Sequence, residues 1–284
     1  MAEKGLEWLR GKRSQMISDG VHAVLKSTGE YEEFHQYLTD ILTALNKTET
    51  IYYRRYNGNT SESGFSTEFL HQLRSIQDEK NRSNDSLYDG IILNGETTKS
   101  KEVYLNMLCK AIKSYYDRKK VAERNRLIIV SHHHGNKKKD RIIKPDFILH
   151  QPNTLNRQVY YGEIKMEGNG ETVSDLVKIS EWETLLEDAF SSDEYLEHGL
   201  DPRFGLYIFV YVYNKGNSRQ SDMSLGKRIK RSRILKFSLN EVVDTKNNLT
   251  YYLQKDIICI SVEDGNERSI KCETLGEILN EIYA

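Results

Sequence analysis

Two short segments, KPDFILH at residues 144–150 and YYGEIK at residues 160–165, decide the fold of this chain. Both are apolar-rich runs of strand length, and the intervening QPNTLN is made of turn formers. The pattern therefore predicts a β-hairpin. Because successive side chains of a strand point to opposite faces, Glu163 and Lys165 are expected on one face and Ile164 on the other.

The register of this hairpin follows if Asp146 pairs with Glu163. His150 then pairs with Val159, and the loop runs over residues 151–158. The hairpin closes in this register without distortion. Two carboxylates and one lysine are thereby brought to a single point.

Two adjacent carboxylates and an ammonium group suit metal-assisted hydrolysis of a phosphodiester. Asp146 and Glu163 can hold Mg²⁺, a cation that prefers oxygen ligands and keeps several waters. Lys165 can orient or deprotonate the attacking water, or offset charge that develops on the phosphate. A carboxylate pair also serves glycoside hydrolysis, but that chemistry gives no reason for the lysine.

The segments around the hairpin predict further helices and strands. Residues 101–119 carry apolar side chains at helical spacing, and residues 126–131 form a short apolar run typical of a strand. Residues 173–190 predict an amphipathic helix. Residues 205–213 are apolar almost throughout, as expected of a central strand that is covered on both faces. The predicted order is helix, three strands, helix and strand.

The combination of Pro145-Asp146 with Glu163-Ile164-Lys165 closely resembles the signature of the PD-(D/E)XK nuclease superfamily, which has the restriction endonuclease-like fold. The predicted element order resembles the α-β-β-β-α-β core of that superfamily. The resemblance implies an α/β fold with a mixed central sheet flanked by helices, and hydrolysis of DNA with Mg²⁺ or Mn²⁺. Asp146 and Glu163 would bind the metal, and Lys165 would position or activate water.

The superfamily usually adds an acidic residue from the first core helix to the metal site. Glu102, at the start of the predicted helix 101–119, is expected to complete the acidic cluster, and Glu96 is the alternative. Either carboxylate also suits an ordinary helix N-terminus, where the helix dipole favours negative charge. In the helix 173–190, Lys178 and Glu181 could reach the active site from one face, but we expect a solvated charged face.

Net charge does not argue for a nucleic-acid partner, since 41 Lys and Arg side chains nearly balance 42 Asp and Glu side chains. The distribution of basic residues does, because two clusters can track a phosphate backbone. One cluster leads into the Pro-Asp strand, and the other follows the last predicted core strand. The expected nucleic-acid-binding residues are Lys137, Lys138, Lys139, Arg141, Lys144, Lys227, Arg228, Lys230, Arg231 and Arg233.

The histidines near the hairpin do not predict a metal site of their own. Residues 132–134 are three consecutive histidines, whose side chains cannot all converge on one zinc ion. They fit a solvated loop or contacts to phosphate. His150 lies on the same strand face as Asp146.

Residues 1–95 carry no motif for catalysis and predict a mainly helical region for substrate binding, dimerisation or partner docking, with a strand at residues 50–56. Residues 96–284 hold the nuclease-like domain. The chain has no apolar leader and no run of about 20 apolar residues, so we expect a cytoplasmic protein that does not enter a membrane. Its three cysteines, Cys109, Cys259 and Cys272, lack paired metal spacing and predict buried thiols.

The resemblance implies an endonuclease in restriction, phage defence or a mobile element. Two alternatives stay open: a nucleic-acid-binding or assembly protein that keeps this fold without cleaving, and a nuclease that cuts RNA. Cutting both strands of a duplex would favour a homodimer, because a symmetric pair presents two sites.

Overall fold

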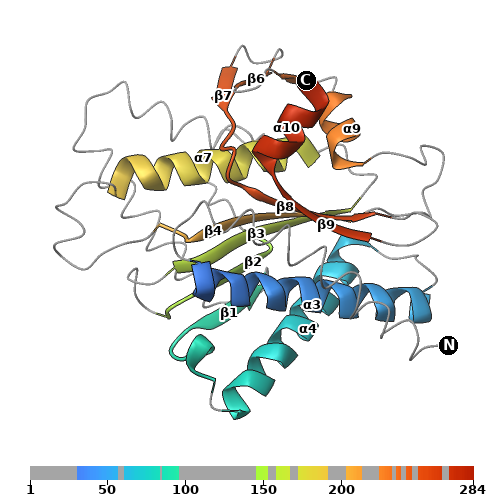
Figure 1. Ribbon diagram of the computed structural model, residues 1–284, viewed down its shortest axis with the longest axis vertical. Helices are drawn as coiled ribbons and strands as arrows, with labels where there is room; N and C mark the ends of the chain where they lie inside the picture. The colour runs from blue at the N-terminus through green and yellow to red at the C-terminus, as the bar shows by residue number, and fades with distance from the viewer. Residues whose placement is uncertain are drawn as a thin grey trace, which may run out of the picture.

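A computed structural model describes residues 31–56, 61–83, 85–95, 145–152, 158–166, 172–190, 203–212, 224–231, 235–237, 241–244, 249–263 and 269–284. In this part of the chain, helices cover both faces of a central six-stranded sheet, as Figure 1 shows. The fold class is therefore α/β, as expected from the sequence.

The helices form two layers, one on each side of the sheet (Figure 1). None of the described helices is long and apolar enough to cross a membrane. Their bounds are α3 (Tyr31–Tyr56), α4 (Glu62–Arg82), the 3-10 helix η2 (Ser86–Tyr88), α7 (Thr172–Phe190), α9 (Leu225–Lys230) and α10 (Leu275–Tyr283).

The central sheet is mixed, with the strand order β1-β2-β3-β4-β8-β9. β3 pairs parallel with β4, and β4 pairs parallel with β8, whereas the other neighbours are antiparallel. A second sheet contains β5, β6 and β7. The strand bounds are β1 (Ile92–Gly95), β2 (Phe147–His150), β3 (Gln158–Met166), β4 (Leu206–Val212), β5 (Leu235–Phe237), β6 (Glu241–Asp244), β7 (Leu249–Tyr252), β8 (Ile258–Glu263) and β9 (Ser269–Thr274).

The predicted hairpin is present as β2 and β3, and most of its register is confirmed. Phe147 pairs with Gly162, which is the register that sets Asp146 opposite Glu163. The prediction is wrong at the closed end, where the register shifts and His150 pairs with Gln158 instead of Val159. The shift is a β-bulge, in which one strand carries an extra residue.

The strand beside β2 on its other side was missed by the sequence analysis. β1 occupies that place and pairs antiparallel with β2, Leu93 lying opposite Leu149. A strand of four residues is too short to give a clear alternation. The expected helix 101–119 and strand 126–131 lie outside the described residues.

Residues 50–56 form the last turns of α3, so the predicted strand is wrong. The hydroxyl of Thr50 donates to the carbonyl of Asn46 at 2.9 Å, within the helix. Tyr52 is buried, and its ring centroid lies 5.7 Å from that of Phe65 in α4. Packing of α3 on α4 therefore outweighs the strand preference of the β-branched and aromatic residues.

One face of the sheet packs against α3 and α4 in a continuous hydrophobic core. Phe69 of α4 meets Phe147 of β2 edge to face, with ring centroids 5.2 Å apart. Tyr37 of α3 meets Tyr160 of β3 in the same way, at 6.3 Å. Residues before position 95 thus share a core with the hairpin, while the division of the chain at residue 95 stays a prediction.

The opposite face of the sheet packs against α7. Trp182 of α7 lies on Tyr161 of β3, with ring centroids 6.3 Å apart. Because β3 alternates, Glu163 and Lys165 share this face with Tyr161, whereas Ile164 belongs to the core under α3 and α4. The alternation expected from the sequence is therefore confirmed.

Two of the cysteines occupy the strands beyond β4. Cys259 in β8 and Cys272 in β9 are buried free thiols, as expected, and burial raises the pKa of each. Cys109 lies outside the described residues.

The aromatic ring of Phe147 lies over Gly162 on the neighbouring strand. A Cβ atom at position 162 would come within 2.1 Å of that ring. The ring of Phe147 is fully buried and also packs on Phe69 and Tyr160, so it has no room to move aside. The hairpin therefore requires glycine at this position.

Gly162→Ala is expected to lower the free energy of unfolding by about 1–3 kcal/mol, the usual cost of overpacking a core. Urea denaturation followed by circular dichroism measures the change. Gly226→Ala is the matched control, because Gly226 lies in helix α9. A Cβ atom added there would lie 3.0 Å from its nearest neighbour, a methyl group of Ile282. Equal stability of Gly162→Ala and the unaltered protein would contradict this packing.

Candidate active site

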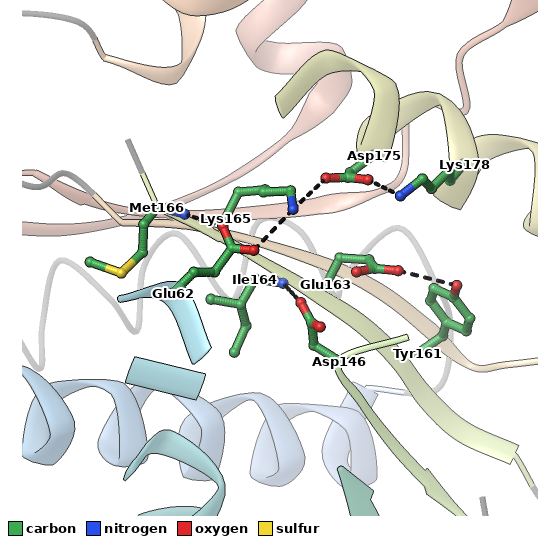
Figure 2. A network of polar contacts seen from close by, with 9 residues as sticks. All are labelled: Glu62, Asp146, Tyr161, Glu163, Ile164, Lys165, Met166, Asp175 and Lys178. Atoms are coloured by element: carbon green, nitrogen blue, oxygen red, sulfur yellow. Dashed lines mark hydrogen bonds and ion pairs between the residues drawn. The ribbon is translucent and has the colours of Figure 1, made fainter. Parts of the chain in front are cut away.

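The three motif residues lie together at the open end of the hairpin, where β3 ends beside the start of β2 (Figure 2). Asp146 immediately precedes β2, and its Oδ2 accepts a hydrogen bond from the backbone N–H of Ile164 at 2.7 Å. Ile164 stands between Glu163 and Lys165 on β3. The carboxylate of Asp146 is therefore tied to the strand segment that carries the other two motif residues.

Glu163 lies in the layer between the sheet and α7. Its side chain is buried. The hydroxyl of Tyr161 donates to its Oε1 at 3.5 Å, a long contact. The carboxylate is thus held in a place with little access to water.

The environment of Glu163 disfavours its ionised form. Burial raises the pKa of the Glu163 carboxyl well above its usual range, and the charges of Asp146 and Asp175 raise it further. Lys178 and Lys165 act in the opposite direction without reversing the shift. A buried carboxyl beside like charges gains from any added positive charge.

Lys165 lies between two carboxylates that the sequence analysis did not connect to it. Its Nζ is 3.0 Å from Oε1 of Glu62 and 3.2 Å from Oδ2 of Asp175. Burial lowers the pKa of Lys165, but the charge of Asp175 and the hydrogen bond and charge of Glu62 outweigh burial and raise it overall. The ammonium form is therefore strongly favoured.

Glu62 belongs to the first turn of α4. The side chain of Ser61 caps this helix by accepting from the backbone N–H of Gly64 at 3.1 Å. Oε2 of Glu62 accepts from the backbone N–H of Met166 at 3.1 Å, while its other oxygen binds Lys165. The start of α4 is thereby fixed to the end of β3, at a place where the helix dipole also favours a carboxylate.

Asp175 and Lys178 reach the site from α7. Asp175 lies in the first turn of that helix, is fully buried, and pairs with Lys178 through Oδ1. The expectation of a solvated face at Lys178 is wrong, since only 16% of its side chain is exposed. Asp175 contacts Lys165 on β3, so the ion pair of Asp175 and Lys178 lies between α7 and the sheet.

Glu62 and Asp175 were missed for different reasons. Glu62 lies 103 residues before Lys165, and an acidic residue at a helix start is common without any such contact. Asp175 and Lys178 are spaced for an ion pair along one helix, which was the available signal. That spacing says nothing about which face of the helix is buried.

Part of the predicted site lies outside the described residues. Glu102 and Glu96, the first basic cluster from Lys137 to Lys144, and Arg233 are in this group. Their roles stay predictions.

The described part of the second basic cluster lies on and just after α9. Arg228 donates through Nε to the hydroxyl of Tyr211 at 3.3 Å, and Tyr211 is the register partner of Lys165 across β3 and β4. Lys227 and Arg231 are exposed. Lys230 is also exposed, and its Nζ donates to the carbonyl of Ile282 at 3.2 Å. The cluster thus reaches the residue that lies opposite Lys165 on the neighbouring strand.

The donor set for a metal is small. Within the described ranges, no group of three or more His, Cys, Asp or Glu side chains is arranged to hold a metal ion. Asp146 and Glu163 form a pair of carboxylates on adjacent strands, and the charge of each bears on the other. Such a pair suits a cation that takes most of its ligands from water.

Comparison of the chain with known proteins finds no match among family models, curated proteins or solved structures. Any assignment of function therefore rests on the fold and on the chemistry of the site.

His150 is a buried structural residue at the edge of the sheet. Its Nε2 lies 2.8 Å from Nδ2 of Asn94, and its Nδ1 lies 2.9 Å from the carbonyl oxygen of Gln151. Burial lowers the pKa of His150 to about 4, although the contact with Gln151 opposes the shift. The neutral ring therefore fills the space between β1 and the end of β2.

Acidification is expected to destabilise the protein through His150. Its pKa is about 4 in the folded protein against an ordinary value of 6.5, so the unfolded chain binds the proton first and stability falls as the pH falls. This group alone should lower the free energy of unfolding by about 2 kcal/mol between pH 7.5 and pH 5.

Urea denaturation at the two pH values measures the change. The pH dependence should shrink in His150→Asn and persist in His71→Ala, whose side chain is exposed on α4. Identical pH dependence in the unaltered protein and His150→Asn would disprove the assignment.

Proposed function

We propose that this protein is a metal-dependent nuclease that hydrolyses phosphodiester bonds in DNA. The observation that carries the proposal is that Asp146, Glu163 and Lys165 lie together at the open end of the hairpin, where β3 ends beside the start of β2. Two carboxylates and a protonated lysine beside them are the groups that this reaction needs.

The order of the described elements supports membership of the PD-(D/E)XK superfamily. Among the described residues, and apart from the short helix η2, the order is a helix, three antiparallel strands, a helix and a strand parallel to β3, formed by α4, β1, β2, β3, α7 and β4. This agrees with the α-β-β-β-α-β core of that superfamily. In this order the first core helix is α4, and the carboxylate that this helix brings to the site is Glu62, which binds Lys165.

The charges of the site fit a bound divalent cation. Among the described residues, four carboxyl groups lie around two ammonium groups: Glu62, Asp146, Glu163 and Asp175 around Lys165 and Lys178. Asp146 and Glu163 would hold Mg²⁺ or Mn²⁺, because the other two carboxylates bind lysines. When bound, the metal would lower the pKa of a water molecule and polarise the phosphate.

Lys165 acts in this proposal as a positively charged hydrogen-bond donor. Two carboxylates hold its Nζ, so the ammonium form is favoured and a role as general base is not. An ammonium group at this place can orient the attacking water and stabilise the charge that develops on the phosphate.

The basic cluster on α9 supports a nucleic-acid substrate. Arg228 donates to Tyr211, which lies opposite Lys165 in the pairing of β3 with β4, and the exposed Lys227 and Arg231 add positive charge beside it. Phosphate contacts of this kind fix the position of a strand without reading its sequence. DNA is proposed as the substrate on the resemblance to the superfamily, as is a role in restriction, phage defence or a mobile element.

Supercoiled plasmid incubated with the protein and Mg²⁺ should be nicked or linearised, and EDTA should abolish the reaction. Lys165→Met should reduce the rate about 10²–10³-fold, the usual loss for a positioned donor that stabilises charge in the transition state. Lys271→Ala is the matched control, since Lys271 is another strand lysine that pairs with a carboxylate, 2.6 Å from Glu273, but is more exposed and lies on β9, three strands away from Lys165.

A matched RNA substrate and a binding assay complete this experiment. Cleavage of the RNA alone would replace DNA by RNA as the substrate. Intact nucleic acid in every reaction, with equal binding in Mg²⁺ and EDTA, would instead indicate a protein that binds without cleaving.

Asp146→Asn should weaken Mn²⁺ binding about 10–100-fold, because an amide keeps the shape of the side chain and removes the charge of a metal ligand. Isothermal titration calorimetry measures the affinity. Asp78→Asn changes an exposed carboxylate on α4 and should bind Mn²⁺ as the unaltered protein does. Unchanged affinity in Asp146→Asn would exclude Asp146 as a ligand.

A further inference from the structure

Asp175 bridges two lysines inside the layer between the sheet and α7. Its Oδ2 is 3.2 Å from Nζ of Lys165, and its Oδ1 pairs with Nζ of Lys178. Exposure of the three side chains is 1% for Asp175, 14% for Lys165 and 16% for Lys178. The bridge is therefore a largely buried three-residue network that joins β3 to the start of α7.

This network holds Lys165 from one side, and Glu62 holds it from the other (Figure 2). Each of the two carboxylates has a second anchor of its own. Glu62 is fixed by the backbone N–H of Met166, and Asp175 is fixed by Lys178. The ammonium group of Lys165 consequently has a defined place beside Glu163, although a lysine side chain is otherwise highly flexible.

A purely structural role explains this arrangement poorly. A buried ion pair adds little net stability, because the charges lose their hydration. The position of Asp175 also has a cost, since its negative charge repels Glu163 and adds to the raised pKa of that carboxyl. A pair that only linked α7 to the sheet would be better placed away from other carboxylates.

We propose that Asp175 and Lys178 are positioning residues, which hold the ammonium group of Lys165 in the geometry required for catalysis. The inference rests on the proposed nuclease function. Asp175 acts through its contact with Lys165, and Lys178 acts through Asp175 by fixing the orientation of the carboxylate. Neither residue belongs to the PD-(D/E)XK motif.

The first test observes Lys165 itself and does not depend on any activity. An ammonium group held by two carboxylates exchanges its protons slowly, so its signal should appear in a ¹H–¹⁵N NMR spectrum of lysine side chains. Lys165→Met identifies the signal by its absence. The signal should disappear in Asp175→Asn, and its persistence there would overturn the proposal.

The second test measures cleavage kinetics. Asp175→Asn should lower kcat about 10–100-fold with KM nearly unchanged, because a misplaced Lys165 affects the reaction step more than binding. Lys178→Met should also lower kcat. Lys178→Arg should keep kcat near that of the unaltered protein, because arginine is still a positive partner for Asp175. Lys178 is partly exposed, so its variants provide the test if Asp175→Asn does not fold.

Asp40→Asn is the matched control for removal of a buried, ion-paired carboxylate. Asp40 pairs with Lys80 at 2.8 Å on the other side of the sheet, with 8% of its side chain exposed. This variant should lose stability and keep its kcat. Wild-type kcat in both Asp175→Asn and Lys178→Met would overturn the positioning role.

The two levels of the proposal fail in different ways. If the unaltered protein cleaves neither DNA nor RNA, the proposed function fails, while the NMR signal still reports whether Asp175 holds Lys165. If the unaltered protein cleaves and Asp175→Asn cleaves equally well, the nuclease assignment stands and the positioning role does not.

Discussion

The ion pairs of Lys165 are the interaction on which the rest of the site depends. Its ammonium group meets Glu62 from α4 on one side and Asp175 from α7 on the other. These helices belong to opposite layers of the fold, and β3 runs between them (Figure 1). A single cation near the end of β3 therefore links the first turns of both helices. Placing both carboxylates in the first turn of a helix reduces the cost of burying them, because the dipole favours negative charge there.

The same site gathers four of the described carboxyl groups. Glu62 and Asp175 bind lysines, and Asp146, just before β2, lies close enough to Glu163 on β3 for its charge to raise the pKa of Glu163. Burial and like charge together oppose ionisation of Glu163. A divalent cation would relieve both effects at once. Lys165 and the proposed metal would thus have the same electrostatic effect, because each places positive charge among carboxylates that lie close together at a buried strand end.

Local sequence patterns predicted the elements that carry clear apolar patterns. The hairpin, α7 and β4 lie within a few residues of their expected bounds. The predictions failed where local preference and packing disagree. Residues 50–56 contain strand-forming residues but continue α3, since Tyr52 packs on α4. β1 has four residues, too few for a pattern, yet it completes the antiparallel pairing of β2.

The sequence by itself determined the chemistry of the motif: Asp146, Glu163 and Lys165 meet because a hairpin of this length and alternation permits one register over most of its span. Only the tertiary structure decided which other carboxylates join them. Glu62 is separated from Lys165 by 103 residues. The spacing of Asp175 and Lys178 is that of an ordinary ion pair along an exposed helix face. Contacts between distant segments depend on how helices pack against a sheet, and no local pattern encodes that packing.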